Sequence, residues 1–95
     1  MIYSVSSQLY EEVQERLLYA IDYRQYFSGS IEFDFEGLVC RLTLSCFVRH
    51  RSEEQVEGTF TYIDDLIPVW WEFHTCDDEG EMLNDFSFEE LRARL

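Results

Sequence analysis

The chain has 95 residues, a length suited to one domain, and its content of 46% hydrophobic and 17% aromatic residues excludes a disordered chain and predicts an aromatic-rich core. Twenty Asp and Glu residues against seven Arg residues, with no Lys, give a formal net charge of −13. This charge repels phosphate, which disfavours direct nucleic-acid binding and adhesion to anionic membranes; a charged partner is expected to be basic, unless the acidic surface serves only solubility.

The first expected element is an amphipathic helix of about five turns, capped by Ser6 or Ser7. Its apolar stripe recurs at steps of three and four residues and consists of Leu9, Val13, Leu17, Ala20, Ile21 and Arg24. Tyr19, Tyr23 and Tyr26 share a neighbouring face. We interpret these tyrosines as residues that flank the core with their hydroxyls in water, rather than as a ligand-binding stripe.

After Gly29 the hydrophobic period changes to two, which predicts two half-buried strands that form a hairpin. A two-residue turn at Glu36-Gly37 gives a register that pairs Phe35 with Leu38, Phe33 with Cys40, Ile31 with Leu42 and Glu32 with Arg41. The apolar pairs then share one face. The pair of Glu32 and Arg41 predicts an ion pair on the opposite, wet face.

The polar segment from His50 to Gln55 is predicted to be a loop, followed by a third strand at 59–63. Asp64-Asp65 interrupts that strand, and Pro68 argues against an uninterrupted central strand. Residues 64–83 are compatible with one bent strand, two strands, or a strand and a loop. The favoured fourth strand places Val69, Trp71 and Phe73 on one face and Trp70, Glu72 and His74 on the other.

A short C-terminal helix is indicated by Ser87 and Glu90, which have the spacing of a capping box. Residues 81–83 are expected to form a short fifth strand or a loop. The predicted fold is therefore one α+β domain over residues 1–95, with the N-terminal helix packed on an antiparallel sheet of three to five strands and the short helix at the C-terminus.

The sequence contains no catalytic constellation that we recognise, so we expect no enzymatic activity and no cofactor. The imidazoles of His50 and His74 have no nucleophilic Ser or Cys in a protease-like or hydrolase-like context. Nucleotide-binding glycine loops are missing, as is any lysine. His74, Cys76 and Glu72 are close in sequence, but one His-x-Cys pair supplies too few ligands for a closed zinc site, and we predict no metal there.

The strand face that carries Trp70 is the best functional lead in the sequence. If Trp71 and Phe73 pack beneath the helix, large apolar groups remain on the opposite sheet face. The possible interaction face consists of Trp70, Glu72, His74, Phe47 and Val39. Three covers for it remain open: the C-terminal segment with Phe86 and Phe88, a second copy of the chain, or a foreign protein.

The start of the sequence has no basic cluster followed by an apolar stretch, and no apolar run approaches the roughly 20 residues that span a bilayer. The cysteines, Cys40, Cys46 and Cys76, are odd in number and lack zinc-type spacing. Reduced thiols and a cytoplasmic location fit this pattern best.

Two segments, IPVWWEFHT at Ile67–Thr75 and LNDFSF at Leu83–Phe88, resemble stretches of small uncharacterised proteins from Bacteroides-type bacteria, some of them associated with mobile elements. The resemblance covers about a third of the chain. It implies a bacterial cytoplasmic accessory protein and supplies no activity, cofactor or site residue.

Three functional hypotheses follow from the sequence. The favoured one is a non-catalytic protein-interaction module or a small homo-oligomer that uses the Trp70 face. The second is an acidic inhibitor of a basic protein, such as an immunity protein or a DNA mimic, which requires its carboxylates on one continuous face: Glu32, Asp34, Glu36, Asp64, Asp65 and Glu72. The third is a small enzyme or metal-binding domain built on His74 and Cys76.

Overall fold

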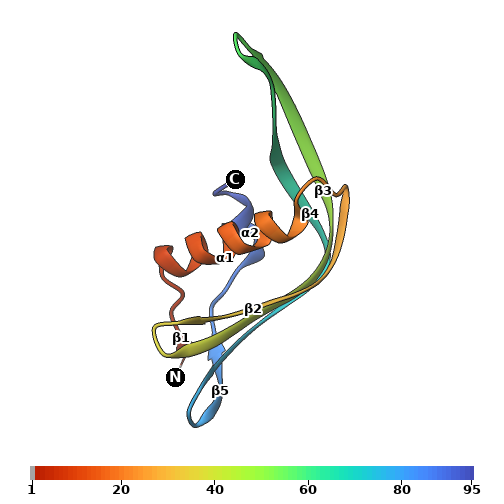
Figure 1. Cartoon of the computed structure of the whole chain (residues 1–95). Helices are drawn as coiled ribbons and strands as arrows, with labels where there is room; N and C mark the ends of the chain where they lie inside the picture. Colours follow the sequence, from red (N-terminus) through yellow and green to blue (C-terminus); the bar gives the residue numbers. More distant parts are fainter. Residues whose placement is uncertain (1) are drawn as a thin grey trace.

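The protein, described here from a computed structural model of residues 2–95, is an α+β structure with a curved five-stranded mixed sheet in the order β1-β5-β4-β3-β2. Both helices lie on the concave side of the sheet (Figure 1). The elements are β1 Ile2–Tyr3, α1 Ser7–Ile21, β2 Tyr26–Phe35, β3 Leu38–Gln55, β4 Gly58–Asp77, β5 Gly80–Asn84 and α2 Phe88–Arg92.

Helix α1 begins where the serine pair predicts it, because the Ser6 side chain accepts a hydrogen bond of 3.2 Å from the backbone N–H of Leu9. The helix has 15 residues and ends at Ile21, so it is one turn shorter than expected. Asp22 has a φ of 55°, which ends the helical conformation, and Arg24 therefore lies outside the helix.

The hairpin of β2 and β3 has the predicted register. Phe35 faces Leu38, Phe33 faces Cys40 and Glu32 faces Arg41, and the turn lies at Glu36-Gly37. The side chains of Glu32 and Arg41 are neighbours across the strands, yet the ion pairs found among residues 2–95 do not include this one.

The predicted loop from His50 to Gln55 is wrong: this segment continues β3 and pairs with residues 58–63 of β4. The two strands leave the body of the molecule as a two-stranded arm (Figure 1). All residues of the arm from Arg51 to Thr61 are exposed. Because water surrounds both faces, neither face requires apolar residues, and the alternation by which a strand is recognised is missing.

Strand β4 is one long bent strand, the first of the three alternatives for this region. Its register with β3 shifts twice, so that Asp64 and Val69 have no partner residue on β3. These β-bulges explain how β4 continues past Asp64-Asp65 and Pro68, because a bulge interrupts ladder pairing and bends the strand. Val69 is 60% exposed, so its predicted place on the core face is wrong.

The sequence predicts an entirely antiparallel sheet, and this prediction is wrong for one strand. Strand β1 precedes the helix and pairs in parallel with β5, with Ile2 opposite Leu83 and Tyr3 opposite Asn84. The segment Gly80–Asn84 is a strand rather than a loop. A two-residue strand has no detectable period, so β1 leaves no signal in the sequence.

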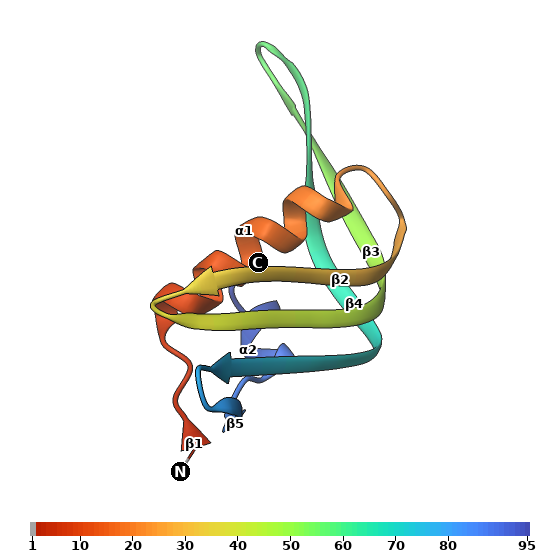
Figure 2. The same ribbon diagram turned by 60° about the horizontal axis from the view of Figure 1, so that its bottom comes forward.

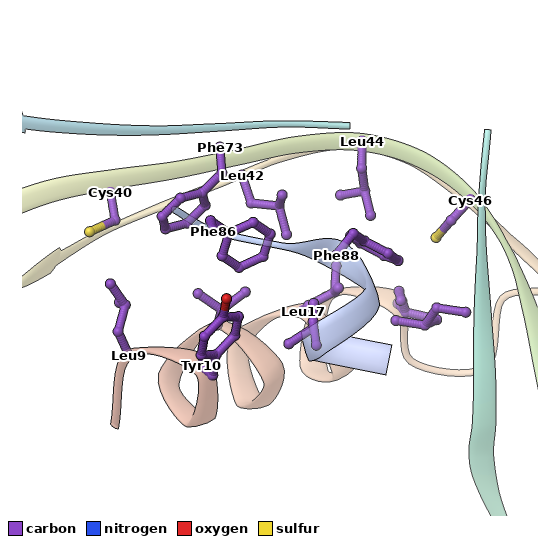
Figure 3. Close-up of a cluster of buried hydrophobic side chains, with 14 of the residues drawn as sticks. Leu9, Tyr10, Leu17, Cys40, Leu42, Leu44, Cys46, Phe73, Phe86 and Phe88 are labelled. Atoms are coloured by element: carbon purple, nitrogen blue, oxygen red, sulfur yellow. The ribbon is translucent and has the colours of Figure 1, made fainter. Parts of the chain in front are cut away.

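Helix α2 and the segment before it complete the core between the sheet and α1 (Figure 3). Phe86 stacks on Phe73 with a distance of 4.2 Å between ring centroids and on Tyr10 at 5.3 Å. Trp71 packs against Phe86 and Phe88. The C-terminal segment therefore covers the concave face and not the face that carries Trp70. Among residues 2–95, neither helix has the length and apolar character to span a bilayer.

Candidate interaction face

The convex side of β2, β3 and β4, which we call the outer face, has no helix packed on it among residues 2–95 (Figures 1 and 2). Strand alternation defines its members, because Leu42, Leu44 and Phe73 of the same strands point into the core. Across the strands, the facing sets are Tyr26, Phe47 and Ile67; Ser28, Ser45 and Trp70; Ser30, Thr43 and Glu72; Glu32, Arg41 and His74; and Asp34, Val39 and Cys76.

One end of the outer face is an apolar patch of Tyr26, Phe47, Ile67 and Trp70, which we call the aromatic patch. Its members are between 44% and 54% exposed, and the rings of Tyr26 and Phe47 lie 5.1 Å apart. The bulge at Val69 contributes to this arrangement, because it changes the strand register between Pro68 and Trp70. Half-exposed aromatic side chains that touch one another are typical of a protein-binding surface.

Pairs of hydroxyl groups occupy the middle of the outer face. The side-chain oxygens of Ser28 and Ser45 lie 2.8 Å apart, and those of Ser30 and Thr43 lie 2.7 Å apart. Each hydroxyl therefore has a cross-strand partner, and Ser45 is itself buried, with 6% of its surface exposed. These small polar side chains lie between the aromatic patch and the charged end.

The charged end of the outer face is centred on His74. Its Nδ1 lies 2.5 Å from an oxygen of Glu81, on β5, and its Nε2 lies 3.2 Å from an oxygen of Glu72. The hydrogen bond to Glu72, followed by that to Glu81, raises the pKa of His74 from its ordinary value. With both ring nitrogens held by carboxylates, the imidazole is placed to carry charge rather than to act as a free base.

The cysteines do not join this cluster. Cys76 lies two residues after His74 on β4 and therefore on the same outer face, as alternation predicts. Cys40 and Cys46 are buried in the core. Burial raises the pKa of the Cys40 thiol to about 11 and also raises the pKa of Cys46, so both core thiols stay protonated. Among residues 2–95, no three His, Cys, Asp or Glu side chains are arranged to hold a metal ion.

The carboxylates that a nucleic-acid mimic would need on one surface are divided. Glu32, Asp34 and Glu72 lie on the outer face. Asp64 pairs with Arg49 at 2.9 Å, and Asp65 is held by Arg92 of α2, also at 2.9 Å. Because these cations compensate the charge of Asp64 and Asp65, the six carboxylates named from the sequence form no continuous phosphate-like array.

All five residues of the predicted interaction face, Trp70, Glu72, His74, Phe47 and Val39, lie on the outer face. Sequence reasoning missed Tyr26 and Ile67, which complete the aromatic patch. The sequence pattern places Tyr26 on one face with the helical tyrosines, although it is the first residue of β2. Ile67 precedes Pro68 and the bulge at Val69, where the strand pattern is broken, and its position opposite Phe47 emerges only from the register of β3 and β4.

In comparisons with protein-family models, curated proteins and solved structures, no match to this chain was found.

Proposed function

We propose that the protein is a non-catalytic protein-interaction module whose outer face binds a basic protein partner. The observation that carries the proposal is the aromatic patch on a sheet face with no covering layer among residues 2–95. The C-terminal segment, which was the intramolecular candidate for this cover, packs on the opposite face through Phe86 and Phe88. An apolar patch of half-exposed rings gains free energy when a partner removes it from water.

The charge distribution favours a basic partner over a second copy of the chain. Beyond the hydroxyl pairs, the outer face carries the carboxylates of Glu32, Asp34, Glu72 and Glu81 against Arg41 and His74, which leaves an excess of negative charge. With a formal net charge of −13, a second copy would bring like charges together at the interface. A basic surface would instead be attracted at long range, and the aromatic patch would supply the short-range contact.

The test is a comparison of immobilised wild type with the Phe47→Ala/Trp70→Ala double variant in pulldowns from cell extract at low and high salt, with captured proteins quantified by mass spectrometry. The control is Tyr23→Ala, which removes a ring that is 77% exposed outside the outer face. We expect a protein of basic composition that wild type and Tyr23→Ala retain equally, with roughly thirtyfold less captured by the double variant. Higher salt should reduce its capture.

Sedimentation of the purified wild type decides whether a second copy of the chain or another protein binds the outer face. A monomer agrees with the proposal. A dimer that dissociates in the Phe47→Ala/Trp70→Ala variant would identify a second copy as the occupant and contradict the basic partner. Equal capture of every protein by the double variant and by Tyr23→Ala would contradict the role of the aromatic patch. Circular dichroism checks that each variant is folded.

A further inference from the structure

Strand β2 ends the sheet on one side, and its outer edge has no neighbouring strand among residues 2–95 (Figure 2). The strand runs for ten residues, Tyr26–Phe35, and pairs with β3 without a register shift. It contains no Lys, Pro or bulge, and of the devices that usually protect an edge from further pairing it has the exposed carboxylates of Glu32 and Asp34. Its outward backbone N–H and C=O groups are therefore available to another strand.

A groove of about 440 Å³ lies between this strand and helix α1. Tyr19 and Ala20 of the helix and Ile31 of the strand give it an apolar lining, and carboxylates of both elements surround it. Residues adjacent in a strand point to opposite sides. A strand added beside β2 would therefore send every second side chain towards this groove and the others towards the outer face.

The charges around the groove select the kind of strand that fits. Glu12 is paired with Arg16 at 2.7 Å, and the guanidinium of Arg16 lies 4.8 Å from the centre of the Phe33 ring. Glu15 and Glu32 form no ion pair among residues 2–95. With Asp34 further along the edge, the site has an excess of negative charge.

We propose that the β2 edge binds an extended peptide segment of a basic protein, which adds to the sheet as a further strand. Apolar side chains of the segment would lie against Ile31 in the groove. Basic side chains at the alternate positions would lie beside Glu32 and Asp34. A second copy of β2 would place acidic residues next to these same carboxylates, so like-charge repulsion disfavours pairing between two copies. This site shares strand β2 with Tyr26 of the aromatic patch, but its proposed contacts with Ile31, Glu32 and Asp34 do not involve Phe47 or Trp70.

Binding is measured with a fluorescein-labelled eight-residue peptide of alternating Arg and Val, by fluorescence anisotropy on the full chain. We expect saturable binding that weakens about tenfold in the Glu32→Gln/Asp34→Asn variant. The matched control is Glu54→Gln/Glu57→Gln, which removes the same charge from the exposed arm and should leave the affinity within twofold.

A second measurement separates strand addition from general attraction of a cationic peptide. The same peptide with all backbone nitrogens methylated keeps its charge but cannot donate ladder hydrogen bonds, and it should bind at least tenfold more weakly. Amide hydrogen exchange should slow at alternate residues of β2 when the unmethylated peptide binds. Equal affinity of the methylated peptide, or unchanged exchange along β2 at saturation, would overturn the proposal.

Discussion

The phenolic oxygen of Tyr10, on helix α1, accepts a hydrogen bond of 3.1 Å from the backbone N–H of Ser87, 77 residues later in the chain. Ser87 caps α2 and accepts a hydrogen bond from the N–H of Glu90, so one half of the predicted capping box is present. Tyr10 supplies the acceptor that Glu90 would provide in the reciprocal half. The two helices are thereby connected at the start of α2.

Tyr10→Phe should lower the free energy of unfolding by about 1 kcal/mol, because the N–H of Ser87 then loses its acceptor while the ring contact with Phe86 remains. Urea titration followed by circular dichroism measures this change. Tyr19→Phe is the matched control, since Tyr19 is 89% exposed and its hydroxyl contacts water. An equal effect of both substitutions would contradict the structural role of the hydrogen bond.

Asp65 should be the most important charged residue for stability. Arg92 donates to both of its carboxylate oxygens, at 3.1 and 2.9 Å, and the N–H of Leu66 donates at 2.8 Å. We expect Asp65→Asn to reduce the free energy of unfolding by about 1–2 kcal/mol, whereas Glu12→Gln, which breaks an exposed helical pair, should cost less than about 0.5 kcal/mol.

The effect of Asp65 should depend on pH in a defined direction. The hydrogen bonds from Arg92 lower the pKa of Asp65 below its ordinary 3.8. Because the pKa is lowered in the folded state, the ionised Asp65 carboxylate stabilises the fold above pH 3.8, and this stabilisation is lost as the pH falls through the lowered pKa. The difference in stability between wild type and Asp65→Asn should therefore shrink in acid, and a constant difference down to pH 2 would contradict this assignment.

The hairpin turn offers a stabilising substitution. Glu36 has a φ of 48° and Gly37 a φ of 83°, as a two-residue hairpin turn requires, but Glu adopts positive φ less readily than Asn. Glu36→Asn should raise the free energy of unfolding by about 0.5–1 kcal/mol. The same substitution in the turn of the arm, Glu57→Asn, is the control, because Glu57 does not have a positive φ, and no gain is expected there.

His74 should make the stability fall as the pH rises. Hydrogen bonds with Glu72 and Glu81 raise its pKa above the ordinary 6.5, while Arg41 on the neighbouring strand faces the same imidazole. The stabilisation of the fold by protonated His74 is then complete below pH 6.5 and is lost as the pH rises through the raised pKa. Urea titrations at pH 6 and pH 8.5 should show a decrease for wild type that is smaller in His74→Gln.

Equal pH dependence in wild type and His74→Gln would show that the imidazole does not carry the effect. A larger decrease in the free energy of unfolding for His74→Gln than for wild type would show that protonated His74 destabilises the fold, contrary to the prediction. Both carboxylate partners are about 60% exposed, so solvent screens the interaction and the expected difference is small.

Local patterns predicted the parts of the fold in which one face is buried. The stripe through Leu9, Val13 and Leu17 identified α1, and the alternation through Phe33 and Leu42 identified the hairpin with its register. The alternation around Trp70 also placed the predicted interaction residues on the side opposite the core. In each case, one face of the helix or strand is buried and the other is in water, so the hydrophobic residues recur with a regular period along the sequence.

Helix α1, the register of β2 and β3, the cap of α2 and the outward direction of Trp70 can thus be predicted from local pattern, because each depends on neighbours along the chain or on one strand pairing. The length of the arm, the parallel strand β1, and the packing of Phe86 and Phe88 on the concave face follow from the folded structure alone. These features depend on contacts between distant segments, or on strands with two wet faces, where no local period exists. Because the C-terminal segment packs on the concave side of the sheet, the aromatic patch on the convex side stays exposed.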